Sequence, residues 1–156
     1  MNEDIDKLIY SAVFDDDNSK KQARTEIRRV AQEKGIFPSS INNLYRAIGH
    51  GEVSGFTVPA INIKTLTYDV ARVLFQLMKQ KHVGALIFEI AKSEIDYSLQ
   101  RPDEFATAIL AAAIKEDWRG PVFIQADHYQ FNKKKYAADS DGEIQKMKDL
   151  IKESID

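Results

Sequence analysis

Val122-Phe123-Ile124-Gln125-Ala126-Asp127-His128-Tyr129 is an apolar run that follows Gly120-Pro121 and ends abruptly on an acid and an imidazole. A short apolar run bounded by turn residues is typical of a buried parallel strand. In α/β folds the chemistry lies just beyond the carboxyl ends of such strands. We therefore expect a functional site at Asp127 and His128.

Asp127 and His128 can contact the same ligand only if the backbone leaves the strand conformation between them. Consecutive side chains of a strand point to opposite faces, so Asp127 and His128 converge only if the strand has already ended there. An imidazole nitrogen can bind a divalent metal, and a carboxylate beside it can carry a proton. An isolated Asp-His pair is also compatible with a turn-capping Asp and a surface His, so the neighbouring motifs have to decide.

Two further apolar runs precede this one, at 56–63 and 84–91, and each is followed by a helical pattern. A barrel of alternating strands and helices spends about thirty residues on each unit, which matches the spacing of the three runs. The first helix is expected to be capped by a Thr and to bury Leu66, Val70, Val73, Leu74, Leu77 and Met78. The second is expected to begin at Pro102 and to bury Phe105, Ile109, Leu110, Ala113 and Ile114. A capping box over 140–143 is expected to open the third.

Residues 1–50 carry a different pattern, which predicts an α-helical N-terminal extension ahead of the 51–156 unit. Apolar positions recur at helical spacing from Ile5 and again from Ala23, and a third short helix is expected from Ser39 or Ser40 to Ile48. This extension could pack on the outside of the following domain or form an oligomer contact, and packing is favoured because surface helices normally cover their own domain.

Two of the strand motifs resemble those of the class II fructose-bisphosphate aldolases. They are Val58-Pro59-Ala60-Ile61-Asn62 and Gln125-Ala126-Asp127-His128, and the resemblance extends from about Leu44 to the end of the sequence. These aldolases are zinc-dependent TIM barrels, so the resemblance implies a partial TIM (β/α)8 barrel made of the first three βα units.

The resemblance also implies a function and roles for individual residues. It predicts a lyase of glycolysis and gluconeogenesis that cleaves fructose 1,6-bisphosphate reversibly to dihydroxyacetone phosphate and glyceraldehyde 3-phosphate. His128 would be a ligand of Zn2+, Asp127 would exchange the proton, and Asn62 would face the substrate. Many relatives carry a small hydroxyl residue where this sequence has Ala91, so Ser93 is expected to take that substrate-binding role.

Glu89 is the unusual residue of the second apolar run, because a charged side chain within a buried strand must be paired or face a cavity. We expect it to be either the partner of a cation inside the barrel or a residue of the site itself.

Three βα units leave two strand edges unpaired and the inner face open. We therefore expect this polypeptide to be inactive alone. It would be either an incomplete part of a longer protein or a chain that forms a homo-oligomer or binds a complementing chain. Two alternative functions stay open: a non-catalytic barrel-like subunit, and an aldolase for another sugar phosphate such as tagatose 1,6-bisphosphate.

Composition excludes several other classes of protein. The net charge is −2, which argues against a nucleic-acid partner, and with no cysteine the chain has neither disulfides nor thiolate zinc ligands. The N-terminal residues lack a signal-peptide profile, and no apolar run approaches the length of a membrane span. We expect a cytoplasmic protein.

Overall fold

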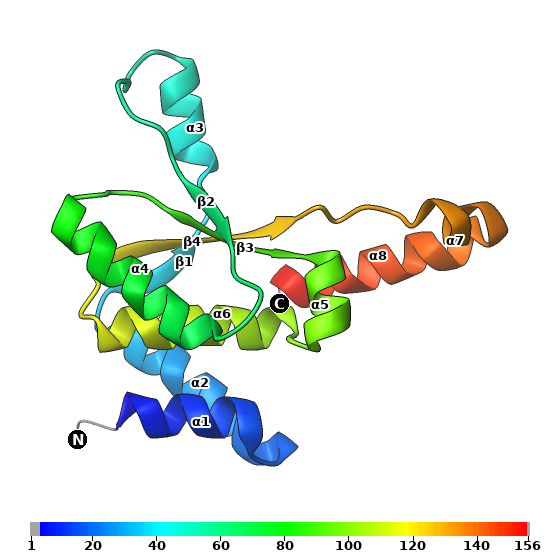
Figure 1. The fold of residues 1–156 in the computed structure, drawn as a ribbon, viewed down its shortest axis with the longest axis horizontal. Helices are drawn as coiled ribbons and strands as arrows, with labels where there is room; N and C mark the ends of the chain where they lie inside the picture. Colours follow the sequence, from blue (N-terminus) through cyan, green and yellow to red (C-terminus); the bar gives the residue numbers. More distant parts are fainter. Residues whose placement is uncertain (1–3, 156) are drawn as a thin grey trace.

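The computed structural model describes residues 4–155, which form an α/β fold around one parallel sheet (Figure 1). The sheet contains β1 (Ile36–Ser39), β2 (Ala60–Asn62), β3 (Ile87–Ala91) and β4 (Gly120–Asp127). Their order across the sheet is β1-β4-β3-β2, and all three neighbouring pairs are parallel. The carboxyl ends of the strands therefore lie along the same border of the sheet.

Five longer helices and three short ones are described in the same part of the chain. The longer ones are α1 (Ile5–Phe14), α2 (Asp17–Glu33), α4 (Thr67–Lys81), α6 (Pro102–Lys115) and α8 (Ser140–Ile155). The short ones are α3 (Asn42–Gly49), α5 (Lys92–Ser98) and α7 (Lys133–Ala138). Their N-termini follow local rules: the Asp16 carboxylate accepts the backbone N–H groups of Asn18 and Ser19 at α2, and Pro102 occupies the first turn of α6.

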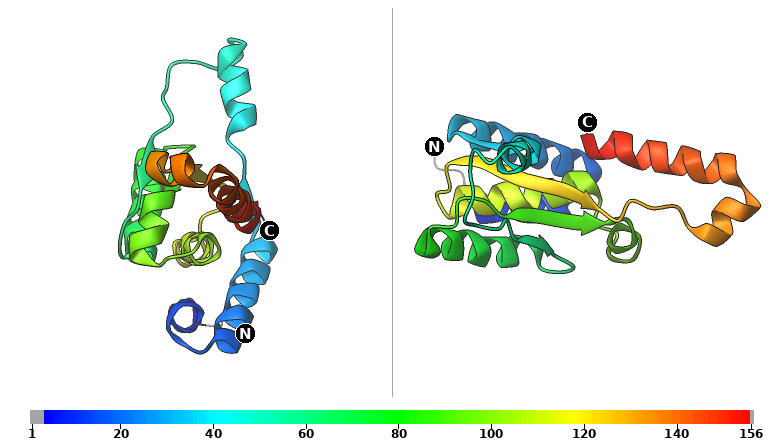
Figure 2. Two further views of the ribbon diagram at one scale, coloured as in Figure 1. Left: turned by 90° about the vertical axis from the view of Figure 1, so that its right-hand side faces the viewer. Right: turned by 90° about the horizontal axis from the view of Figure 1, so that it is seen from above.

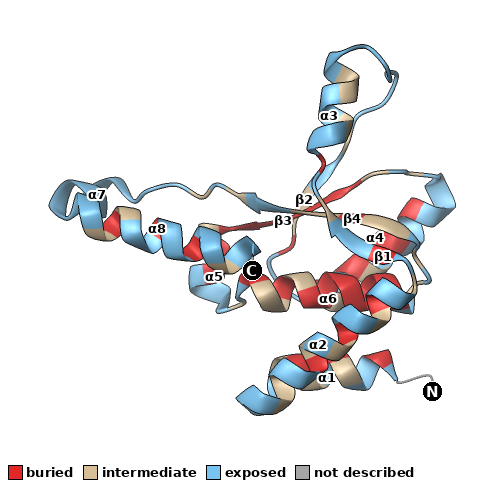
Figure 3. Ribbon diagram, turned by 180° about the vertical axis from the view of Figure 1, so that it is seen from behind, coloured by how far each residue is buried: buried red, intermediate tan, exposed pale blue. Residues whose placement is uncertain are grey.

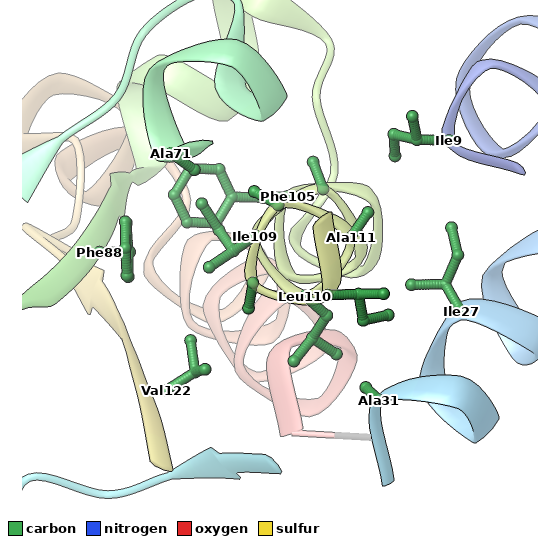
Figure 4. Packing of buried hydrophobic residues seen from close by; sticks show 14 of the residues in the cluster. Ile9, Ile27, Ala31, Ala71, Phe88, Phe105, Ile109, Leu110, Ala111 and Val122 are labelled. Carbon is green, nitrogen blue, oxygen red and sulfur yellow. The ribbon is translucent and has the colours of Figure 1, made fainter. Parts of the chain in front are cut away.

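Helix α6 is the centre of the hydrophobic core. Phe105 and Ile109 are fully buried, and the whole helix from Thr107 to Ile114 is buried, so its apolar residues face every direction. Figure 4 shows why: Phe88 and Val122 of the sheet lie on one side of α6, and Ile9 and Ile27 of the outer helices lie on the other. The molecule thus has three layers, with α4 and α6 between the sheet and the pair α1–α2.

The two faces of the sheet have different surroundings. One face carries Ile61, Phe88, Ile90, Val122 and Ile124, which belong to or pack against the core. The strand register places Asn62, Glu89 and Gln125 in one row across the opposite face, followed by Ala91 beside Asp127. Seen from above, β3 and β4 lie in front of the helices, and α3 projects from this side (Figure 2, right). The long helices therefore cover one face of the sheet only.

The α/β class and the three expected strands are confirmed, but the predicted α-helical extension over residues 1–50 also contains a strand, at residues 36–39. This segment is strand β1, which pairs in parallel with the amino-terminal half of β4. Gly35 has a φ of 70°, which takes the chain out of α2, and its carbonyl accepts the Gly120 N–H at 2.9 Å. Pro38 disfavours a helix and is accommodated at the sheet edge. The proposed boundary near residue 50 remains a prediction.

Helix α4 turns only part of the expected side to the core: Met78 is buried and Leu74 packs against the core, as expected. Its buried residues are Thr67, Ala71, Phe75 and Met78, whereas Leu66, Val70, Val73 and Leu77 are exposed. The Phe75 ring packs 5.1 Å from the Phe88 ring, measured between centroids. The expected Thr cap is absent too, because Leu66 precedes the helix and the Thr67 hydroxyl donates to Gln100 Oε1 at 2.6 Å.

The stripe expected for α6 is confirmed, and the cap expected for α8 is displaced by one residue. The Asp139 carboxylate accepts the Gly142 N–H at 2.9 Å, so Asp139 is the cap and Ser140 is the first helical residue. A side chain at position 142 would meet that carboxylate, because a Cβ placed there lies 2.1 Å from Asp139 Oδ2.

Among the described residues no helix is both long enough and apolar enough to cross a membrane.

Candidate functional site

Polar side chains from two strand ends meet at the carboxyl border of the sheet (the strand arrowheads in Figure 1). Asn62 ends β2 and Asp127 ends β4, and the Asn62 amide Nδ2 donates to Asp127 Oδ2 at 3.0 Å. The two strands are not neighbours, because β3 lies between them. The β3 residue paired with Asp127 is Ala91, whose small side chain leaves room for this contact across the strand.

Glu94 joins the same cluster from the first turn of α5. Its side chain is buried, and Oε2 accepts both the Ala91 N–H at 2.8 Å and the Asn62 Nδ2–H at 3.2 Å. Lys64 Nζ lies 3.6 Å from the other carboxylate oxygen. Glu94 therefore fixes the start of α5 and orients the Asn62 amide towards Asp127.

Glu89 lies one row below Asp127 on the same face of the sheet. Its side chain is buried, and Oε1 accepts the Gln125 Nε2–H at 2.9 Å. Burial raises the pKa of Glu89, and the negative charges of Asp127 and Glu94 raise it further, whereas His128 opposes them. Of the two expectations for Glu89, proximity to the candidate site is the one that the geometry supports, since its hydrogen-bond partner is an amide and not a cation.

The backbone turns sharply after Asp127, as convergence with His128 requires. His128 has a φ of 46°, in the left-handed region that few side chains adopt. Its Nε2 lies 3.4 Å from Asp127 Oδ1, and 73% of its side chain is exposed. The structure therefore brings Asp127, His128 and Asn62 together, as the sequence predicted, while their chemical roles remain predictions.

Ser93, the fourth predicted site residue, is placed apart from this cluster. It is exposed in the first turn of α5, and none of the hydrogen bonds within residues 4–155 connects it to Asn62 or Asp127. Its neighbour Glu94, which the sequence analysis passed over, holds the cluster instead. The signal for Glu94 was an acid at the third position of a helix that starts directly after a strand.

The described residues do not form a complete zinc site. Within residues 4–155 no group of three or more His, Cys, Asp or Glu side chains is arranged to hold a metal ion. A catalytic zinc ion takes three protein ligands, of which His128 would be one. Further ligands would have to come from outside this set, so we derive no chemical step through a metal.

Comparisons of the chain with protein-family models, with curated proteins and with solved structures found no match. Any chemistry of this chain therefore has to follow from the polar cluster itself. It offers a partly exposed carboxylate held by an amide, a neighbouring imidazole, and two buried carboxylates close by. Such a set is suited to moving a proton at a substrate hydroxyl.

Proposed function

We propose that this chain supplies the first three βα units of a class II aldolase-type (β/α)8 barrel. The reaction would be the reversible cleavage of fructose 1,6-bisphosphate to dihydroxyacetone phosphate and glyceraldehyde 3-phosphate. The observation that carries the proposal is the 3.0 Å contact between Asn62 and Asp127. These residues belong to two separate motifs, and the contact joins the two motifs at one strand-end site.

The coverage of the sheet also supports a barrel-type interpretation. Parallel sheets are normally covered on both faces, and a barrel achieves this with helices outside and layered side chains inside. Here the long helices lie on one face only (Figure 2). The side chains on the other face become more polar towards the carboxyl border. Along β3 they change from Ile87 to Glu89, and along β4 from Phe123 through Gln125 to Asp127. A barrel places its chemistry at that border.

Asp127 is the residue that would move the proton. In the cleavage direction its carboxylate takes the proton of the hydroxyl whose carbon becomes the aldehyde. The oxygen electrons form the new C=O bond as the carbon–carbon bond breaks, and the pair from that bond passes to the ketone half as an enediolate. Asn62 holds the carboxylate in place through its Nδ2–H, and Glu94 fixes that amide from the other side.

The zinc ion, the role of Ser93 and the cytoplasmic location belong to the same proposal. Zn2+ with His128 as one ligand belongs to a completed site, because residues 4–155 lack a full ligand set. Ser93 would contact substrate only if another part of the completed protein held the substrate against α5. A cytoplasmic location goes with the proposed glycolytic reaction.

The test is complementation of an incomplete aldolase. The chain is co-expressed with a class II aldolase polypeptide that lacks its first three βα units, and cleavage of fructose 1,6-bisphosphate is followed by coupled detection of triose phosphate. We expect activity from the mixture and none from either part alone. Asp127→Asn should lower the turnover by about 10²- to 10⁴-fold, as for a lost general acid or base.

Asp149→Asn is the matched control, because it removes an exposed carboxylate from α8 and should leave turnover unchanged. A complex that forms without cleaving any ketose bisphosphate would contradict the proposal and favour a non-catalytic subunit. A higher kcat/KM for tagatose 1,6-bisphosphate would assign the other epimer as the substrate.

A further inference from the structure

An exposed apolar line runs along α4. It consists of Leu66, Val70, Val73 and Leu77, which are 68%, 36%, 62% and 46% exposed. Their spacing places them on one side of the helix, whereas the core contacts of α4 come from Ala71, Phe75 and Met78 on another side. Leu66 also has a φ of 49°, a costly conformation for a leucine that presents its side chain to solvent.

The neighbouring edge of the sheet, at β2, is not paired with another strand within residues 4–155. On the inner side of β2, the Pro59 carbonyl accepts the Ile87 N–H at 2.9 Å and the Ile63 N–H donates to the Glu89 carbonyl at 3.4 Å. In a parallel strand alternate residues direct their polar groups to opposite sides. The N–H and C=O groups of Ala60 and Asn62 therefore point away from β3, towards the free edge.

The other edge of the sheet is protected. In β1 the Gly35 carbonyl faces β4, so Ile36 and Pro38 direct their polar groups outward. Pro38 has no N–H to offer, and proline on an edge strand is a common obstacle to pairing with another chain. The two edges of the sheet thus differ, and only β2 combines free donors with an adjacent apolar helix.

We propose that the β2 edge and the exposed line of α4 form the interface with a second copy of this chain. The two β2 strands pair antiparallel about a two-fold axis perpendicular to the sheet, and the two α4 helices pack beside each other. Paired strands lie about 4.8 Å apart. Because α4 connects β2 to β3 and covers both strands, its axis lies about 4.8 Å from the two-fold axis. The two α4 helices would therefore be about 10 Å apart. That separation is at the upper end of the usual helix-packing range of about 8–10 Å.

The charges of α4 favour this antiparallel arrangement. Asp69 lies in the first turn and Lys81 in the last, where the other basic residue, Lys79, donates to the Glu116 carbonyl at 2.7 Å. A two-fold axis places the acidic start of each helix near the basic end of its partner and opposes the two helix dipoles. A parallel pair would bring like charges together. The surface is therefore complementary to itself, as an interface between identical chains must be.

This inference does not depend on the proposed function. A barrel closed by further βα units would use the same β2 edge and would also have to replace β1 beside β4. The homodimer and the closed barrel are therefore alternative states of the β2 edge. Failure of the dimer would leave the aldolase proposal intact, and failure of complementation would leave the dimer intact.

The test measures molecular mass by light scattering and sedimentation equilibrium over a concentration series up to about 100 μM. We expect a dimer from the unmodified chain. The double variant Val73→Glu/Leu77→Glu should raise the dissociation constant by about 100-fold or more, because it places charges at the centre of the apolar contact. Ile151→Glu is the matched control on α8, since Ile151 is 45% exposed and Leu77 is 46% exposed.

Hydrogen exchange supplies a second measurement that does not depend on a variant. Protection of the Ala60 and Asn62 amides should increase with protein concentration, and this increase should be absent in the double variant. Circular dichroism should show that both variants are folded. A monomer at the highest concentration, a dimer that persists in the double variant, or exchange of Ala60 and Asn62 that is independent of concentration would overturn the proposal.

Discussion

The two faces of the parallel sheet are made by alternate residues of the same strands, yet they serve different purposes. In β3, Phe88 and Ile90 point into the helical layer, and Glu89 between them points to the polar face. In β4, Val122 is buried in the core, whereas Asp127 ends on the polar face beside Asn62. Figure 3 shows the buried residues concentrated in α6 and in the middle of the sheet. The covered face should therefore determine stability, and the polar face should determine chemistry.

The largest loss of stability is expected on the covered side. Phe105 is fully buried in α6, so Phe105→Ala should lower the free energy of unfolding by about 3–5 kcal/mol through lost burial and the cavity left behind. Chemical denaturation followed by fluorescence and circular dichroism measures this change. Phe131→Ala is the control, because Phe131 is 46% exposed, and its effect should be well under half as large. Equal losses from the two variants would show that α6 is not the centre of the core.

The strands and the strand-end residues were predictable because each depends on local sequence. The apolar runs ending at Asn62, Ala91 and Asp127 became β2, β3 and β4, and the parallel arrangement then brought Asn62 and Asp127 together. Periodicity of two and turn residues are sufficient for such predictions.

The errors arose where tertiary packing decides between two local possibilities. Two sides of α4 are apolar, and periodicity cannot tell which of them meets α6. Strand β1 is four residues long and is stabilised by pairing with β4, more than eighty positions away in the sequence. Glu94 was passed over because an acid near a helix start is common, and its burial against Asn62 depends on the whole sheet.

A smaller loss of stability is expected at Glu94, which connects the start of α5 to the polar face of the sheet. Glu94→Ala should lower the free energy of unfolding by about 1–3 kcal/mol, because the Ala91 N–H is then left without its buried acceptor. Glu94→Gln should cost less, since its amide oxygen can still accept that N–H. The two variants are compared by urea denaturation at constant pH. Equal stabilities of Glu94→Ala and the unmodified chain would remove Glu94 from the support of the site.

Glu89 should destabilise the folded chain at neutral pH. Because burial and the charges of Asp127 and Glu94 raise its pKa in the folded state, the ionised form is disfavoured relative to the unfolded chain. This cost is absent below the unfolded pKa of 4.5, grows as the pH rises towards the folded pKa, and is constant above it. Glu89→Gln should therefore be more stable than the unmodified chain at pH 7.

The difference in stability between Glu89→Gln and the unmodified chain should disappear as the pH falls to about 4. Thermal unfolding of both proteins over this pH range measures it, and Gln at position 89 keeps an acceptor for the Gln125 amide. A stability difference that does not change with pH would mean that Glu89 does not titrate in this range, and would separate it from the polar cluster.

The smallest effect on stability is expected at the residue with the largest proposed role in chemistry. Asp127 is only partly buried, and Asn at this position can still accept the Asn62 Nδ2–H, so Asp127→Asn should change the free energy of unfolding by no more than about 0.5 kcal/mol. The same variant should abolish most of the turnover of the complemented enzyme, because an amide cannot take the substrate proton. Denaturation and kinetics on one preparation compare the two effects directly. A loss of stability comparable to that of Phe105→Ala would contradict the division between the two faces, because the polar face would then carry the fold as well as the chemistry.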